Sequence, residues 1–168
     1  AERLLAEGTL TSENLFAPQM LTEEEILTTH TLAYWTHLKN QTLPRKEVRA
    51  IGFEMTPKLV ERGRYIAHAS YECALYAQQY GVSLNIAGGT HHAFADHGEG
   101  FCVFNDFAVT SNLLLNRGQA KQILIVDLDV HQGNGTASIF ANEPRVFTFS
   151  MHGAKNYPFR KQQSDLDI

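Results

Sequence analysis

The sequence predicts an α/β protein in which a parallel sheet carries helices on both faces. Residues 123–126 are four consecutive apolar residues, which predict a strand buried on both faces. Two further short strands are predicted at residues 83–87 and 146–150. Stretches with helical caps and helical spacing precede and separate them. Because strands that alternate with helices favour strand-helix-strand units, we expect these strands to pair in parallel.

The first helix signal is a capping box formed by Thr22 and Glu25, which lie three positions apart. Leu21 and Ile26 supply the hydrophobic staple that accompanies such a box. A helix is therefore expected to begin near residue 23.

A longer helix is predicted from Thr56, an N-cap residue followed by Pro57, to about Tyr80 before Gly81. Cap residues supply hydrogen-bond partners for the backbone groups at a helix end that have none within the helix. The predicted apolar face of this helix comprises Leu59, Ile66, Ala69, Cys73, Ala77 and Tyr80.

A further helix is expected between the strands at 83–87 and 123–126. Asp106 is interpreted as its N-cap, and the apolar pattern continues through Leu115. Gly118 follows at the position where a glycine commonly ends a helix.

Composition indicates one soluble domain. The chain has 168 residues, of which 43% are hydrophobic and 19% charged, with a formal net charge of -4. A chain of this length and hydrophobic content suffices for one hydrophobic core.

There is no signal-peptide pattern and no apolar run near the ~20 residues that cross a bilayer, so we expect a cytoplasmic location without membrane association. An acidic chain lacks the basic surface of a nucleic-acid-binding protein. Cys73 and Cys102 alone do not indicate a disulfide framework.

Asp127, Asp129 and His131 follow the second predicted strand at alternate positions. Alternate side chains of an extended segment point to the same side. Asp129 and His131 can therefore converge on one metal ion, and a carboxylate and an imidazole both suit zinc. Gly133 and Gly135 allow the backbone to turn sharply next to them. On these residues alone, carboxylates that cap a helix or bind solvent are an open alternative.

Histidines follow the other two predicted strands. His91 and His92 come after the strand at 83–87 and two glycines, and His152 comes after the strand at 146–150. A histidine pair by itself is usually part of a solvated loop. Open parallel sheets, however, place their sites at the carboxyl ends of the strands. Polar clusters after three strands therefore indicate a functional site at that edge.

Three long motifs occur in the chain: GGTHHAFADHGEGFCVFND at 88–106, DLDVHQGNGT at 127–136 and FSMHGAKNYPFRK at 149–161. Together they resemble the zinc-dependent histone deacetylase superfamily, which includes acetoin-utilisation-type proteins and acetylpolyamine amidohydrolases. The resemblance covers nearly the whole chain, and the motifs stand in the order that the family shows.

The resemblance implies an arginase/deacetylase-like fold and a zinc-dependent hydrolase that removes the acetyl group from acetyl-lysine or a similar acetylated amine. Zinc would be held by Asp129 and His131. His92 would be the main proton-transfer residue, and His91 would assist it. Asp127 would accept a hydrogen bond from His91 and so fix the tautomer of its ring.

Asn134 departs from the family members that carry a carboxylate at this position. A neutral amide can orient His92 but stabilises an imidazolium less, so the pKa of His92 is expected to lie lower than in those relatives. The remaining histidines and two loop carboxylates are interpreted as structural or surface groups rather than ligands: His30, His37, His68, His97, Asp96 and Glu99.

The resemblance also implies a narrow substrate tunnel walled by Phe101, which follows Gly100, and by Tyr157. An apolar slot of this kind would hold the methylene chain of an acyl-lysine or acylpolyamine. Without the resemblance, both rings would be interpreted as core. A structural monovalent cation such as potassium would lie near the zinc. Its implied ligands, largely backbone oxygens, are Asp127, Asp129, His131, Ser150 and Met151.

By the same resemblance, a third zinc ligand and an oxyanion-stabilising tyrosine would lie beyond Ile168, and a first strand would precede the opening helix. We therefore expect residues 1–168 to be the central part of a single deacetylase domain, incomplete at both ends and inactive alone. A deacetylase-fold binding or scaffolding protein without turnover is one alternative. An arginase-like metal hydrolase is another, although Gln132 and Gly133 stand where it would need an aspartate.

Overall fold

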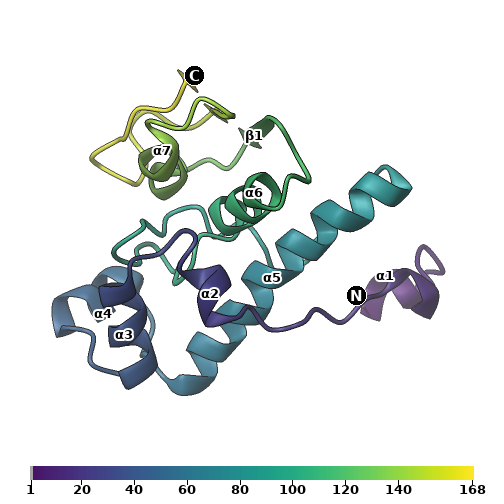
Figure 1. The fold of residues 1–168 in the computed structure, drawn as a ribbon, viewed down its shortest axis with the longest axis horizontal. Helices are drawn as coiled ribbons and strands as arrows, with labels where there is room; N and C mark the ends of the chain where they lie inside the picture. Colours follow the sequence, from purple (N-terminus) through teal and green to yellow (C-terminus); the bar gives the residue numbers. More distant parts are fainter. Residues whose placement is uncertain (1) are drawn as a thin grey trace.

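In the computed structural model, which describes residues 2–168, helices form most of the first two thirds of the chain and strands appear in the last third (Figure 1). The elements in chain order are α1 (Glu2–Ala6), the 3-10 helix η1 (Ser12–Asn14), α2 (Glu23–Ile26), α3 (Leu32–Asn40), α4 (Arg45–Ile51), α5 (Pro57–Tyr80), α6 (Asp106–Asn116), β1 (Ile123–Asp127), α7 (Asn134–Phe140), β2 (Val146–Ser150) and β3 (Leu166–Asp167).

The three strands form one parallel sheet in the order β1-β2-β3. Ile125 of β1 lies opposite Thr148 of β2, and Asp127 lies opposite Ser150. The strands at 123–126 and 146–150 are thus confirmed, with parallel pairing. Their register brings the carboxyl ends of β1 and β2 together, which is where the sequence predicts the site.

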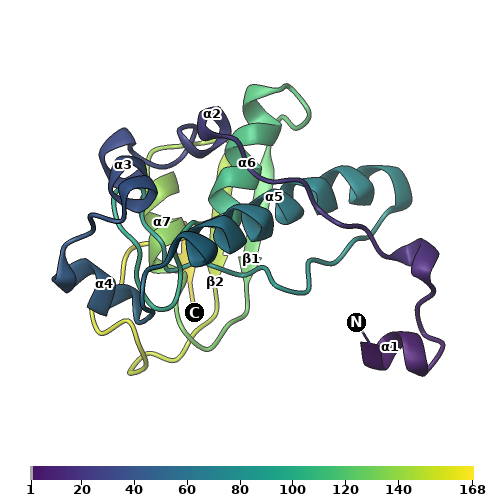
Figure 2. The same cartoon turned by 90° about the horizontal axis from the view of Figure 1, so that it is seen from below.

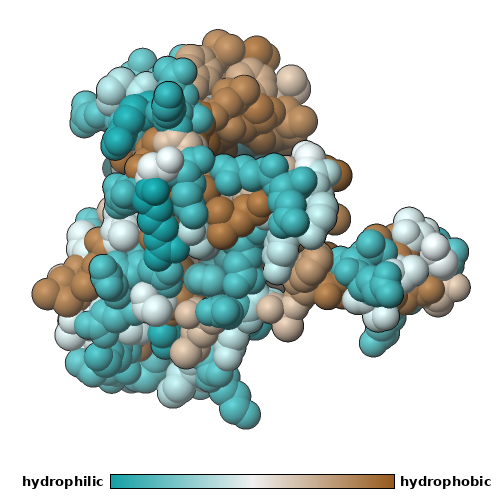
Figure 3. Space-filling view, turned by 45° about the vertical axis from the view of Figure 1, so that its right-hand side comes forward, coloured by the Kyte–Doolittle hydropathy of each residue, from teal (hydrophilic) through white to brown (hydrophobic). Residues whose placement is uncertain are grey.

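Helices α6 and α7 pack on one face of this sheet. The core on that face comprises Ala108, Leu115, Ile125, Phe140 and Val146. On the opposite face, Leu124 and Val126 of β1 are 63% and 52% exposed. The expectation that this strand is buried on both faces therefore does not hold within residues 2–168, because no described segment covers that side. Figure 3 shows hydrophobic side chains gathered on the upper part of the molecule, where the sheet lies.

The long helix α5 runs from Pro57 to Tyr80 and ends at Gly81, as the sequence predicts. Thr56 caps it by accepting a hydrogen bond from the backbone N–H of Leu59 at 3.2 Å. Its buried face is not the predicted one, since Tyr80 is exposed and the buried residues are Val60, Ala67, His68, Ser70 and Tyr71. The apolar pattern missed this face because two of its members are polar residues that the fold buries.

The main core lies where α5 meets α3 and α6. Its largest fully buried side chains include Tyr34, Phe104 and Leu38. The predicted capping box at Thr22 begins α2, and both of its hydrogen bonds are formed. Figures 1 and 2 both show α1 set apart from the rest of the molecule. No helix within residues 2–168 is long and apolar enough to cross a membrane.

The segment 83–87 is not a strand, which corrects the sequence prediction. Residues 83–85 have no regular secondary structure, and residues 86 and 87 form a turn. Its apolar side chains point outward, and Leu84 and Ile86 are 77% and 63% exposed. A strand requires a neighbour that pairs its backbone N–H and C=O groups, and no described strand lies beside this segment.

Candidate active site

His91 and His92 lie side by side and are both buried, at 6% and 5% exposure. The centres of their rings are 4.1 Å apart. They belong to the loop that connects α5 to α6, and the sequence placed them after a strand that the structure does not form. Burial of two imidazoles requires partners for their ring nitrogens, and each histidine has a different one.

The partner of His91 is Asp127, the last residue of β1. The Nδ1–H of His91 donates to Asp127 Oδ2 at 2.5 Å. This contact fixes the tautomer of His91 and leaves its Nε2 free. A side chain at Gly133 would not fit beside it, because a Cβ there would lie 2.4 Å from the same carboxylate oxygen.

The partner of His92 is Asn134, the first residue of α7. His92 Nδ1 lies 2.7 Å from Asn134 Oδ1, and the amide is almost fully buried. Burial lowers the pKa of His92 below its ordinary value, and the neighbouring His91 adds to this effect. The hydrogen bond to Asn134 opposes the lowering without overcoming it. The ring is therefore neutral near pH 7.

Asp129 and His131 lie together just beyond β1, and both side chains are about half exposed. His131 Nδ1 is 3.1 Å from Asp129 Oδ1, and the backbone N–H of His131 donates to the same oxygen at 2.8 Å. Burial raises the pKa of Asp129, but the His131 N–H and the nearby histidines outweigh this, so that its pKa is lowered. The carboxylate is therefore ionised near pH 7.

The separation of the two side chains is compatible with two ligands of one zinc ion. Two ligand atoms at ~2.1 Å from a tetrahedral zinc are roughly 3.4 Å apart. His131 Nδ1 and Asp129 Oδ1 are 3.1 Å apart, so a small adjustment would bring both to one ion. Within residues 2–168, no three His, Cys, Asp or Glu side chains are grouped closely enough to hold a metal. A zinc site with three protein ligands therefore needs a donor in addition to this pair.

The residues implied as ligands of a monovalent cation also lie at this edge. Asp127 and Ser150 are register partners on β1 and β2, and Ser150 is buried. The backbone N–H of Met151 donates to the carbonyl oxygen of Asp127 at 3.0 Å. The structure thus brings the two strand ends together, and cation binding there stays a prediction.

Gly100 and Tyr157 both lie against His92. A Cβ at Gly100 would lie 2.7 Å from His92 Cδ2 and 3.1 Å from Tyr157 Cε1, and its φ is +53°, so only glycine suits this position. The Tyr157 ring meets His92 edge to face at 5.0 Å. Phe101 is 64% exposed and contacts Phe53. Its role as a tunnel wall stays a prediction.

Asn105 connects the histidine loop to the rest of the fold. Its Nδ2 donates to the carbonyl of Ala93 and to the hydroxyl of Thr136, both at 3.0 Å. Its backbone N–H donates to Nε2 of the buried His30, whose Nδ1 bonds the carbonyl of Phe94 at 3.0 Å. Burial lowers the pKa of His30 to about 4, which keeps its ring neutral as the acceptor bond requires. His30 is thus a structural histidine.

Asp106 holds the other end of this loop. Its buried carboxylate accepts hydrogen bonds from Ser70 Oγ at 2.5 Å, Gly89 N at 3.0 Å, Thr90 N at 2.7 Å and Thr90 Oγ1 at 2.8 Å. The interpretation of Asp106 as the cap of α6 is wrong, because the N-cap is Asn105. The sequence could not reveal this role, since the donors lie 16 to 36 positions away.

Replacing Asp106 with alanine is expected to lower the free energy of unfolding by about 3 kcal/mol, because buried amide groups of the loop lose their acceptor. Urea unfolding of the full-length protein measures this change. Asp96→Ala, which removes an exposed carboxylate of the same loop, is the matched control and should change stability by less than ~0.5 kcal/mol. Equal stability of Asp106→Ala and the wild type would contradict the anchoring role.

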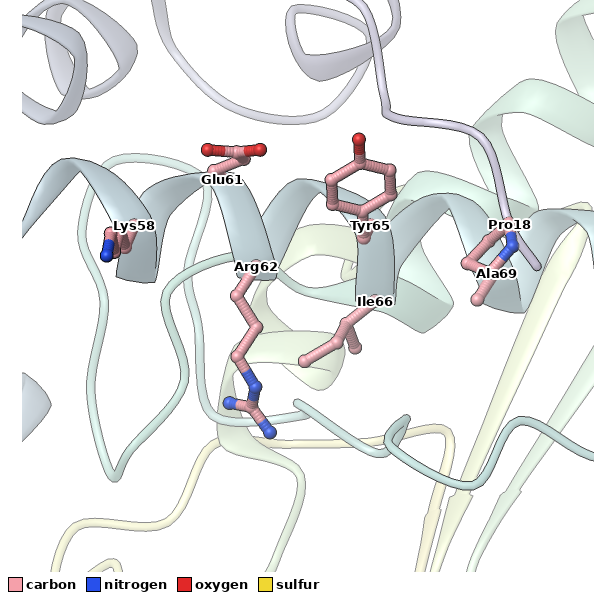
Figure 4. Close-up of a pocket in the computed structure, with 7 residues that line it drawn as sticks. All are labelled: Pro18, Lys58, Glu61, Arg62, Tyr65, Ile66 and Ala69. Atoms are coloured by element: carbon pink, nitrogen blue, oxygen red, sulfur yellow. The ribbon is translucent and has the colours of Figure 1, made fainter. Parts of the chain in front are cut away.

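A groove with a volume of 460 Å³ lies away from the paired histidines, along the outer side of α5 (Figure 4). Lys58, Glu61 and Arg62 line it together with Tyr65 and Ile66 of the same helix. Its charged residues belong to a solvent-facing helix surface, and it contains none of the histidines or carboxylates of the sheet edge. The predicted site residues therefore lie outside this groove.

A parallel α/β fold that presents an Asp-His pair beside two anchored histidines defines a candidate metal-hydrolase site. The family model for the histone deacetylase domain matches residues 1–167. The chain belongs to the histone deacetylase family.

Individual relatives agree with this membership. An uncharacterised protein of Picosynechococcus sp. is 43% identical over 165 residues, which are 98% of this chain and 55% of that protein. Acetoin utilization protein AcuC of Bacillus subtilis is 30% identical, covering 87% of this chain and 40% of that protein. The crystal structure of a histone deacetylase homologue from Aquifex aeolicus superposes with a TM-score of 0.80 at 26% identity, covering 98% of this chain and 50% of that one.

These matches confirm the predicted deacetylase-like α/β fold. The chain spans about half the length of the relatives that it matches.

Proposed function

We propose that this chain contributes the paired histidines and two zinc ligands to a deacetylase, which hydrolyses the amide of acetyl-lysine or of a similar acetylated amine. The arrangement that carries this proposal is the pair His91 and His92, each held by its own partner, beside Asp129 and His131. Family membership supports a hydrolase of this class.

Zinc bound by Asp129 and His131 would polarise the substrate carbonyl and activate a water molecule. A neutral His92 ring that donates a hydrogen bond from Nδ1–H to Asn134 Oδ1 has its Nε2 free to take up a proton. The protonated ring can then return that proton to the leaving amine. His91 assists from its fixed orientation against Asp127.

The substrate class is part of the proposal. A histone deacetylase homologue has been crystallised with SAHA, and that structure superposes on 98% of this chain. We propose that an acetylated lysine side chain or acetylated polyamine reaches His92 past Gly100 and Tyr157, which already contact it. A monovalent cation such as potassium at Asp127 and Ser150, a single deacetylase domain around residues 1–168, and a cytoplasmic location remain predictions of the sequence.

Two alternatives predict different results. An arginase-like hydrolase needs further carboxylates around two metals, but Gln132 is fully buried and its Nε2 donates to Gln162 O at 2.7 Å and Asp167 Oδ1 at 2.9 Å. This side chain therefore supports the end of the sheet. A scaffolding protein that keeps the fold without turnover would retain zinc but hydrolyse no acetylated substrate.

The test is to purify the full-length protein, measure its zinc content, and assay acetyl-lysine peptides, acetylpolyamines and small acetylated metabolites. We expect turnover of at least one class, loss of turnover with a chelator, and recovery with added zinc. Zinc binding without any turnover would favour the scaffolding alternative. Hydrolysis of a guanidinium substrate instead would favour the arginase-like one.

A further inference from the structure

Glu99 lies among three polar residues, of which Asn134 and Tyr157 belong to the candidate site. Its Oε1 accepts a hydrogen bond from Nδ2 of Asn134 at 3.1 Å. The same oxygen accepts a second hydrogen bond from the hydroxyl of Tyr157. Its other oxygen is 3.9 Å from Nε2 of His97. The side chain is 25% exposed, and the sequence indicated no role for it beyond a loop charge.

The carboxylate of Glu99 determines how the amide of Asn134 is turned. An ionised carboxylate only accepts hydrogen bonds, so the NH2 group of Asn134 must face Glu99. The amide oxygen then faces His92, as the 2.7 Å contact to Nδ1 requires. An oxygen acceptor at this place requires the proton of the neutral His92 ring to reside on Nδ1. Without Glu99, the Asn134 amide could rotate by 180°, so that either its oxygen or its NH2 group would face His92.

Resting on the function proposed above, we propose that Glu99 is a positioning residue: through Asn134 it holds the His92 proton on Nδ1 and keeps Nε2 available for proton transfer. In relatives with a carboxylate at position 134, the negative charge would contact His92 directly. Here the nearest carboxylate of this network is Glu99, which lies on the other side of the Asn134 amide. Donors and acceptors are matched at both hydrogen bonds of this network, from Asn134 to Glu99 and from His92 to Asn134.

The same geometry explains why an amide suits position 134. An aspartate there would bring a second carboxylate into direct contact with Glu99, where the wild type has a hydrogen bond of 3.1 Å. Two carboxylates at this distance repel unless one is protonated. Asn134→Asp is therefore expected to be harmful in the presence of Glu99 and beneficial in its absence.

Tyr157 strengthens the constraint on Glu99. Burial and the neighbouring Glu99 carboxylate raise the pKa of Tyr157, so its hydroxyl stays protonated and donates. The ring of Tyr157 also meets His92 edge to face. One oxygen of Glu99 thus accepts hydrogen bonds from both Asn134 and Tyr157, two residues that contact His92.

A double-mutant cycle in the full-length protein tests the proposal. Glu99→Ala and Asn134→Asp should each lower kcat by about 10- to 100-fold, the usual effect of losing an outer partner at such a site. The double variant should be more active than either single variant, because the carboxylate introduced by Asn134→Asp then accepts from Nδ1 of His92 without a competing carboxylate. Asp96→Ala, which removes an exposed carboxylate bonded to His97 in the same loop, is the matched control and should keep wild-type kcat.

Nitrogen-15 NMR of the histidine rings supplies a readout that does not depend on activity. At about pH 8, above the ordinary histidine pKa, the wild type should carry the His92 proton on Nδ1. Glu99→Ala should give a mixture of tautomers, and the double variant should restore Nδ1. Zinc content should be unchanged in all variants.

Two results would overturn the inference: an Nδ1-protonated His92 in Glu99→Ala, or single-variant effects that merely add in the double variant. Absence of wild-type turnover on every acetylated substrate would refute the proposed function instead. The NMR comparison would still decide the role of Glu99, so the two failures are distinguishable.

Discussion

Replacing His131 with alanine in the full-length protein is expected to abolish stoichiometric zinc binding and deacetylation together. Asp129 and His131 are the two proposed zinc ligands just beyond β1, and His131 Nδ1 lies 3.1 Å from Asp129 Oδ1. Loss of the imidazole leaves one carboxylate that is half exposed and easily solvated, so zinc affinity should fall steeply. Elemental analysis of the purified variant and a turnover assay measure the two effects.

His37→Ala is the matched control for that substitution. His37 is an exposed histidine of α3 whose Nδ1 is hydrogen-bonded to Thr42 Oγ1 at 2.9 Å. It should retain both zinc and turnover. Full zinc content in His131→Ala would remove His131 from the ligand set.

Replacing His92 with alanine is expected to preserve zinc and lower kcat by about 100-fold or more, because proton transfer by a positioned histidine contributes that much. His92 contacts Asn134 and lies beside Tyr157, and it is not one of the two proposed ligands. Steady-state kinetics at saturating substrate, with zinc measured in the same sample, separate loss of proton transfer from loss of metal.

The pH dependence of the wild type provides a second check on His92. Burial lowers the pKa of His92, so the neutral, proton-accepting form persists below the ordinary histidine pKa. As pH falls, kcat/KM should therefore decline only after the pH has passed below about 6.5. His92→Ala should lose this acidic limb, and an unchanged profile in the variant would show that another group titrates.

The sequence alone determined the features that depend on neighbouring residues. Thr56, Pro57 and Gly81 defined both ends of α5, because caps act within one helical turn. The apolar runs at β1 and β2 predicted strands that the structure confirms. The alternation of Asp129 and His131 predicted their common side, and they lie together beyond β1.

Only the tertiary structure decided the features that depend on distant residues. The segment 83–87 had the composition of a strand, but no described strand pairs with it. Asp106 looked like a helix cap, yet its carboxylate binds Ser70 and the loop before His91. Glu99 looked like a solvated loop charge until Asn134 was brought to it from 35 positions away. Hydrogen bonds between residues so far apart in the sequence form only when the chain folds. Local sequence patterns therefore cannot predict which donor will pair with which acceptor.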